Sequence, residues 1–171
     1  HCDDIRFIFI ENCSVGDSPN SQLFRSFSRL ELLWIGCTES SNVSKISIGR
    51  SAFSSMDNLK YVYIGKGVTS IGDYAFENCD NLKRVIFHNG ASDLTSIGDS
   101  AFNSCTSLTS FDFPDSLTYI GGWAFQSSGL TEVNIPNSVT ELGELAFAEC
   151  GNLTKVTIGN GLSAISAGAF S

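Results

Sequence analysis

The chain has few charged residues and no long apolar segment. Of its 171 residues, 16% are charged and 42% are hydrophobic, a balance too apolar for an intrinsically disordered chain. No run of about 18 apolar residues occurs, so the sequence predicts no membrane insertion. Lys and Arg number 10 against 18 Asp and Glu, a net charge of -8. Because the cationic residues are also scattered, the sequence argues against a nucleic-acid partner.

Residues typical of catalytic and metal sites are equally scarce. The two histidines are His1, at the start of the chain, and His88, which follows a predicted strand and is expected to be solvated. No nucleophile-elbow, phosphate-loop or metalloprotease motif occurs. The paired Cys-x-x-Cys spacing of zinc sites is also missing. The sequence therefore predicts a protein that is not an enzyme and holds no cofactor or metal.

An internal repeat is the strongest positive feature of the sequence. The pair Ala-Phe occurs six times at intervals of 22 to 26 residues, at positions 52–53, 75–76, 101–102, 124–125, 146–147 and 169–170. A second block, Leu-x-x-Val-x-Ile, recurs with it and seeds seven strands, the first two being degenerate copies at 5–10 and 30–35. We therefore predict one domain over 1–171, with irregular coils in 1–45 and regular repeats of about 23 residues in 46–171.

The two blocks indicate a stack of coils. The last apolar residues of Leu-x-x-Val-x-Ile alternate as in a strand, and Gly in the Ile-Gly-x-x-Ala-Phe turn supplies a permissive backbone. The Phe fills the interior of the coil. One coil cannot bury its apolar face alone, so coils must stack. A β-sandwich is the less favoured alternative, since its strands would alternate strictly and its turns would vary.

The full pattern resembles the BspA-like leucine-rich repeats of bacterial and protist surface proteins. Residues 130–150 match Leu-x-x-Val-x-Ile-Pro-x-Ser-Val-Thr-x-Ile-Gly-x-x-Ala-Phe-x-x-Cys almost in full. The resemblance is clear over 46–171 and weak over 5–45. It implies an α/β solenoid: a right-handed leucine-rich-repeat stack of about six to seven coils, with a parallel β-sheet on the concave face and short turns or helical pieces opposite. It also implies an extracellular or cell-surface location, and its motif contains no catalytic residue.

Three cysteines fall in the repeat register. Cys79, Cys105 and Cys150 each lie three residues after the repeat Phe, a position that Met56 and Ser128 hold in other coils. A position that accepts Cys, Met or Ser is a small interior slot, where a free Cys behaves as a small hydrophobe. We expect buried free thiols; the alternative is a disulfide between Cys79 and Cys105, since equivalent sites in adjacent coils are close.

The N-terminal part holds three more cysteines outside this register. Cys2, Cys13 and Cys37 lie among the irregular coils, and a Cys2–Cys13 bridge would clamp the first of them. The chain starts at His1 without an initiator Met and stops just after Ala169-Phe170. We interpret it as a mature form or as a fragment of a longer protein.

The residues that the repeat leaves free point outward from the strands and suggest a binding site. In the last three coils they are polar, but in the first four they form an apolar stripe: Phe7, Phe9, Leu32, Trp34, Tyr61, Tyr63, Arg84 and Ile86. An exposed apolar stripe indicates a binding surface, and Trp and Tyr are favoured at hot spots. The structural alternatives are a covering segment or a cross-strand aromatic ladder that only stabilises the sheet.

Three functions follow from these patterns. The first is a non-catalytic protein-interaction or adhesion module that binds a protein partner, such as a host or matrix protein, through the concave face. The second is a structural solenoid that associates with itself, because exposed coil ends stack readily. The third and weakest is glycan binding by outward threonines: Thr109, Thr131, Thr154 and Thr157.

Overall fold

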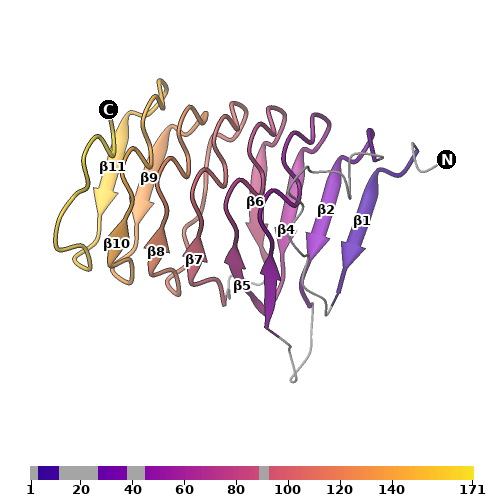
Figure 1. The fold of residues 1–171 in the computed structure, drawn as a ribbon, viewed down its shortest axis with the longest axis horizontal. Helices are drawn as coiled ribbons and strands as arrows, with labels where there is room; N and C mark the ends of the chain where they lie inside the picture. The colour runs from indigo at the N-terminus through magenta and orange to yellow at the C-terminus, as the bar shows by residue number, and fades with distance from the viewer. Residues whose placement is uncertain (1–3, 12–26, 38–44, 89–92) are drawn as a thin grey trace.

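The protein is a parallel β-solenoid of about five turns. The computed structural model describes residues 4–11, 27–37, 45–88 and 93–171. Each turn runs down one side of the stack and up the other, and the two termini lie at opposite ends (Figure 1). The sequence predicts about six to seven coils, whereas the structure shows about five turns. The connection between the first two strands lies outside the described residues.

One side of the solenoid carries the strands that the Leu-x-x-Val-x-Ile block predicts. A four-stranded parallel sheet has the order β1 (Phe7–Ile10), β2 (Leu32–Ile35), β4 (Tyr61–Ile64), β6 (Arg84–Phe87). A separate parallel pair follows, β9 (Glu132–Ile135) with β11 (Lys155–Ile158). Side chains alternate between buried and outward positions along β2, β4 and β9, as expected for strands packed on one face.

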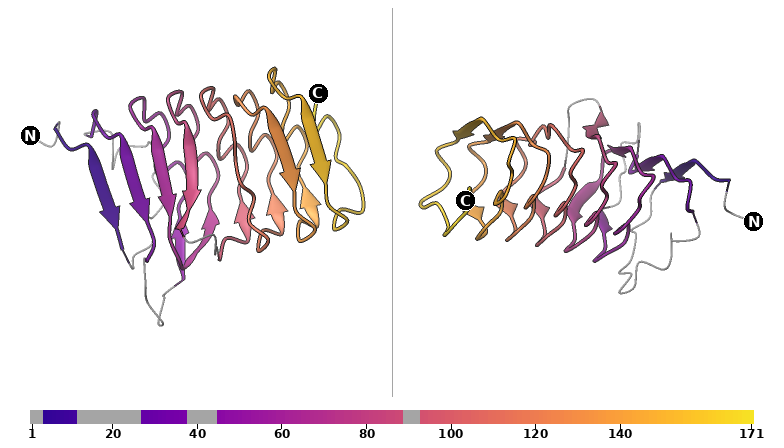
Figure 2. Two further views of the ribbon diagram at one scale, coloured as in Figure 1. Left: turned by 180° about the vertical axis from the view of Figure 1, so that it is seen from behind. Right: turned by 90° about the horizontal axis from the view of Figure 1, so that it is seen from above.

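The opposite side is a second parallel sheet. Its order is β10 (Glu141–Leu142), β8 (Tyr119–Ile120), β7 (Ser96–Ile97), β5 (Val68–Ile71), β3 (Ile46–Ile48). Viewed along the strands, the two sheets face each other as two layers (Figure 2). The described residues contain no α-helix, so the α/β class expected from the resemblance is corrected to an all-β solenoid. The segments on this side are short and rich in β-branched residues, which suit a strand better than a helix.

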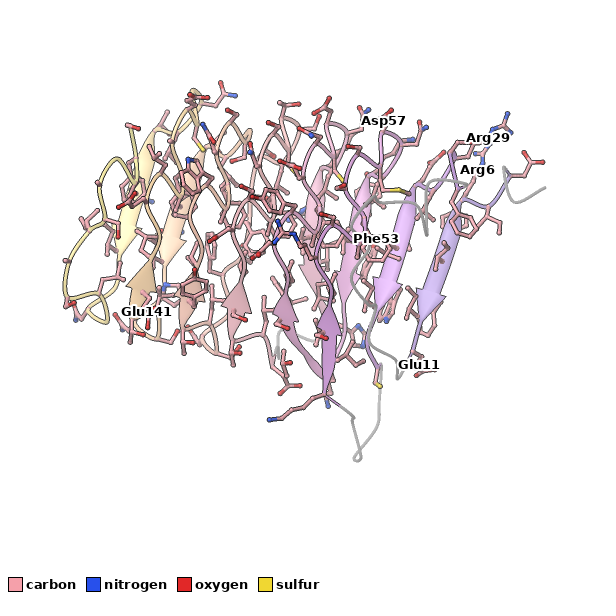
Figure 3. The ribbon with its side chains drawn as sticks, viewed as in Figure 1. Arg6, Glu11, Arg29, Phe53, Asp57 and Glu141 are labelled. Carbon is pink, nitrogen blue, oxygen red and sulfur yellow. The ribbon has the colours of Figure 1, made fainter. Side chains whose placement is uncertain are left out.

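A column of phenylalanines fills the space between the sheets. The first five repeat Phe side chains are fully buried, and their ring centroids stack 5.2 to 5.4 Å apart. The half-buried Phe170 continues the stack at 5.4 Å. Phe53, labelled in Figure 3, is buried at one end of this column and stacks on Phe76. Each Phe follows a buried Ala, whose small side chain lets adjacent coils approach closely. The predicted interior role of the Ala-Phe pair is confirmed.

The Ala-Phe turns form a third hydrogen-bonded ladder along the stack. In the first of them, the N–H groups of Ser51, Phe53 and Ser55 donate to carbonyls of the next coil at 2.7 to 2.8 Å. The same three donations recur at the next four turns, from the turn at 74–78 to the turn at 145–149. This geometry places two residues of each turn in the left-handed region, as with Ser51 (φ 52°) and Ser55 (φ 57°). Most residues at these positions are not glycine, so the turn holds them there at a backbone cost.

The repeat glycines are needed for a different reason from the permissive backbone that the sequence predicts. Gly72 and Gly98, from the Ile-Gly-x-x-Ala-Phe turns, are not among the residues with positive φ. A Cβ on Gly72 would lie 2.8 Å from the carbonyl oxygen of Ile48, and one on Gly98 would lie 2.7 Å from the backbone nitrogen of Asp73. Glycine is therefore required for close approach of neighbouring coils rather than for conformational freedom.

The cysteines of the repeat are free and buried, as predicted. The thiols of Cys79, Cys105 and Cys150 each bond the carbonyl of a repeat Phe in an earlier coil at 3.2 Å. The alternative disulfide between Cys79 and Cys105 is wrong. Cys37 is likewise free and buried, while Cys2 and Cys13 lie outside the described residues.

Candidate functional site

The eight residues predicted to form the stripe lie together on one face. The strand register aligns them in two rows, Phe9–Trp34–Tyr63–Ile86 and Phe7–Leu32–Tyr61–Arg84. We call these eight residues the aromatic face. Strands β1, β2, β4 and β6 position them, since the intervening residues of each strand point into the core.

The first row is a stacked aromatic ladder. The ring centroids of Phe9 and Trp34 are 5.5 Å apart, and those of Trp34 and Tyr63 are 5.2 Å apart with an interplanar angle of 8°. The indole N–H of Trp34 donates to the Gly36 carbonyl at 3.1 Å, which fixes the ring in the row. Stacked rings at this spacing stabilise each other beyond their buried area. The ladder interpretation of the stripe therefore has direct structural support.

His88 extends the ladder. Its ring lies edge-on to Trp34, with centroids 5.1 Å apart, and the residue is half-buried. The expectation of a solvated His88 is wrong. The two residues belong to different coils, so their contact depends on the register of the stack and not on any local pattern.

Several side chains of the aromatic face remain accessible to solvent. Phe7 and Phe9 on β1 are 67% and 55% exposed, while Trp34, Tyr61 and Tyr63 are half-buried. Singly exposed apolar residues are common on protein surfaces, but a contiguous patch indicates an interaction site. The arrangement can supply large, rigid, apolar anchors to a partner.

Ion pairs border the face at its N-terminal end. The Glu31 carboxylate accepts a hydrogen bond from Lys60 Nζ at 3.0 Å and lies 3.7 Å from the Arg6 guanidinium. The Lys60 hydrogen bond lowers the pKa of Glu31. Arg29 pairs with Asp4 at 2.7 Å, and Figure 3 shows Arg6 and Arg29 near each other at that end. Arg84, by contrast, has no ion pair within the described part of the chain.

A break in the strand ladder adjoins the face and was not anticipated from sequence. Residues 108–113 should form the strand between β6 and β9, but they form none. Phe111 occupies the inward position where other coils have Val, Ile or Leu, and it is only 6% exposed. Its ring packs edge-on against Phe87 and Phe125, at 5.7 and 5.0 Å. A Phe requires more room at this inward position than a smaller aliphatic side chain. We attribute the unpaired coil in part to this difference in size.

Proline accounts for the rest of the break. Gly36, Gly65 and Gly159 each follow a strand and donate their N–H to the preceding coil at 2.7 to 2.9 Å. Pro114 and Pro136 hold the same place in their coils and have no N–H to donate. The coil 108–113 thus loses this hydrogen bond on both sides. Proline within a strand pattern was the available signal that this seed would not pair.

The break opens a groove of about 370 Å³. We call it the strand-break groove. One wall is the whole of β6 and the other is the segment from Asp112 to Asp115. Ile86 and Phe87 on the first wall and Phe113 and Pro114 on the second are half-buried, and Asp112 and Asp115 are exposed.

The outward threonines form backbone-bonded ladders. The hydroxyl of Thr131 donates to the Thr109 carbonyl at 3.3 Å, and that of Thr154 donates to the Thr131 carbonyl at 3.1 Å. A second column, Thr95, Thr118 and Thr140, bonds the preceding coil in the same way. These hydroxyl protons are engaged within the solenoid, which weakens the case for a glycan site.

Membrane-spanning helices and metal-binding clusters are both absent from the described ranges. No helix there is long and apolar enough to cross a membrane. Nor do those ranges hold a group of three or more His, Cys, Asp or Glu side chains that could bind a metal ion.

Comparison with known families agrees with the geometry of the coils. Residues 46–171 match the model of the BspA-type leucine-rich-repeat region in six copies. The chain belongs to this family. Its repeats generally mediate protein interactions, and the match points to no enzyme family. A search of proteins with curated functions gave no match.

Solved structures of bacterial leucine-rich-repeat proteins share the fold. A protein from Bacteroides ovatus is 32% identical over 82% of this chain, with a TM-score of 0.71. One from Eubacterium ventriosum is 26% identical over 88%, with a TM-score of 0.73. One from Faecalibacterium prausnitzii, described as a leucine-rich cell surface protein, is 29% identical over 84%, with a TM-score of 0.53. This chain spans 37%, 38% and 42% of their lengths, respectively.

Proposed function

We propose that this BspA-type solenoid is a non-catalytic adhesion module that binds a protein through its aromatic face. The observation that carries the proposal is the stacked row Phe9–Trp34–Tyr63, fixed in place yet left partly exposed beside Phe7. A partner that covers this row buries rigid rings whose conformational entropy is already lost, which favours affinity. The proposal includes two features of the solenoid: its coil is right-handed, and the aromatic face is on its concave side.

The surroundings of the face support a protein partner. The ion pairs of Glu31 with Lys60 and of Arg29 with Asp4 form a polar rim beside an apolar centre, which is the usual anatomy of an interface. The Faecalibacterium relative is described as a cell surface protein. That description supports an extracellular or cell-surface location for this chain. We propose a host or matrix protein as the partner that it meets there.

A double substitution tests the face. We expect Trp34→Ser with Tyr63→Ser to weaken binding to purified matrix proteins by at least about tenfold, since aromatic anchors carry most of an interface's free energy. Surface plasmon resonance measures binding, and thermal melting is measured on the same samples. The matched control replaces Asn134 and Thr157, which hold the same outward position on β9 and β11, with Ser. Unchanged binding together with a lowered melting temperature would leave the ladder with a purely structural role.

Self-association is the second candidate. Strand β1 pairs only with β2 within the described part of the chain and exposes Phe7 and Phe9 beside its unpaired edge. Exposed edges of this kind pair with other strands. Light scattering of the protein decides, because a monodisperse monomer excludes assembly through this edge.

A further inference from the structure

The outer edge of β6 carries backbone groups that the solenoid does not use. The N–H of Arg84 donates to Lys60 on the β4 side, at 3.4 Å. Hydrogen bonds alternate in direction along a strand, so the N–H and C=O groups of Val85 and Phe87 point to the other side. There, no described residue bonds them. Pro114, which faces Phe87 across the break, has no N–H to offer.

These backbone groups line the strand-break groove. All four residues of β6 lie on one wall, and the half-buried Phe113 and Pro114 lie on the other. Elsewhere in the stack, the neighbouring coil satisfies such groups. A backbone donor or acceptor without a protein partner must bond water or a ligand, because leaving it unpaired is costly. The groove therefore combines free strand-pairing groups with apolar walls.

The charged side chains at the groove indicate which charge a ligand should carry. The groove lining holds three charged side chains, the exposed Asp112, Asp115 and Arg84, so the carboxylates outnumber the single cation. None of the three forms an ion pair within the described residues. The chain as a whole carries a net charge of -8. A basic side chain placed beside these carboxylates would be attracted by both the local and the overall field.

We infer that the strand-break groove binds an extended basic segment of the protein partner, which pairs its main chain with β6. Strand addition of this kind draws affinity from main-chain hydrogen bonds and specificity from alternate side chains. One set of apolar side chains would pack on Ile86 and Phe113, and a Lys or Arg would lie beside Asp112 and Asp115. The inference rests on the proposed function, in that the aromatic face beside the groove binds the same partner.

Three blocked peptides test the inference on the wild-type protein. The probe is a hexapeptide of alternating Val and Lys with an acetylated N-terminus and an amidated C-terminus. One comparison peptide has Glu in place of Lys, and the other has methylated amide nitrogens at every second residue. Calorimetry should show binding of the Val-Lys peptide and at least about tenfold weaker binding of both comparison peptides. Equal binding of the methylated peptide would overturn strand addition, and equal binding of the Glu peptide would overturn the basic partner.

A pair of proline substitutions tests the site. Pro114→Gly restores the donor that faces Phe87, as Gly65 has in its coil. Because this N–H would occupy the Phe87 carbonyl that the peptide needs, we expect it to weaken Val-Lys binding at least about tenfold. The matched control is Pro136→Gly. It restores the donor that faces Phe113, on the opposite side of the coil 108–113, and should leave binding unchanged. Melting of both variants verifies that they fold. Unchanged binding by a folded Pro114→Gly variant would overturn the assignment.

The outcomes separate this inference from the proposed function. The double variant Trp34→Ser, Tyr63→Ser should keep its affinity for the Val-Lys peptide while losing the matrix protein. If the matrix protein binds the aromatic face but the peptide does not bind the wild type, only the groove inference falls. If light scattering shows a dimer that Pro114→Gly dissociates, a second copy of the chain occupies the groove and the partner segment is overturned.

Discussion

At the residue scale, the buried thiols show how the repeat uses polar atoms. Each repeat thiol donates to a Phe carbonyl of an earlier coil, so it satisfies a buried acceptor while filling a small slot. Burial raises the pKa of Cys79 to about 12 and raises that of Cys105 well above its ordinary value. These cysteines therefore remain protonated at neutral and mildly alkaline pH.

Protonated, buried thiols should resist modification. At pH 8 we expect Cys79 and Cys105 to stay unlabelled by iodoacetamide in the native protein and to react fully in guanidinium chloride, since the thiolate is the nucleophile. Peptide mass spectrometry locates the label. Because folding raises the pKa of Cys79, its contribution to stability is complete below about pH 9 and is lost as pH rises toward about 12. Rapid native labelling of Cys79 would contradict the burial.

The left-handed residues of the Ala-Phe turns give a second residue-scale prediction. Ser55 has a φ of 57° and an exposed side chain. We expect Ser55→Val to lower the free energy of unfolding by about 1–3 kcal/mol, because a β-branched residue fits this region poorly. Ser55→Gly should cause no loss. Urea unfolding measures both, with Thr157→Val on exposed β11 as control. Equal stability of the Val and Gly variants would mean that the turn is not strained.

At the element scale, stability depends on the column of stacked rings. Phe102 stacks between Phe76 and Phe125 at 5.3 and 5.2 Å. We expect Phe102→Ala to cost about 3–5 kcal/mol through lost burial and a cavity between the sheets. Phe7→Ala, at a 67% exposed position, should change stability much less. Chemical denaturation compares the two, and similar losses would refute the column as the core.

The elements also show what sequence patterns can and cannot predict. The Leu-x-x-Val-x-Ile block correctly placed β4, β6, β9 and β11, because alternation of apolar residues reports directly on a half-buried strand. The second sheet was expected as turns or helical pieces, since its two- to four-residue strands are too short for a clear period. The break at 108–113 was also missed: the pattern counts Phe111 as apolar but ignores its size and the missing donor of Pro114.

At the scale of the whole molecule, each coil contacts mainly its neighbours, so the repeat specifies the stack without specifying a partner. The sequence therefore predicted the family, the solenoid and the eight residues of the aromatic face. It could not predict the contact of Trp34 with His88 or the groove beside β6. Both depend on the register between coils, which emerges only when the stack is assembled.

The two tryptophans offer the most direct test of the aromatic face. Trp34 lies in the stacked row, whereas Trp123, 40% exposed, lies in an Ala-Phe turn outside it. Replacing either one by Phe leaves a single fluorescent reporter. When a matrix protein that binds this chain is added, the fluorescence of the Trp123→Phe variant should shift to the blue and be quenched less by acrylamide. The reason is that a partner on this face excludes water from Trp34. The account would be contradicted if the Trp34→Phe variant, which keeps only Trp123, responded while the Trp123→Phe variant did not.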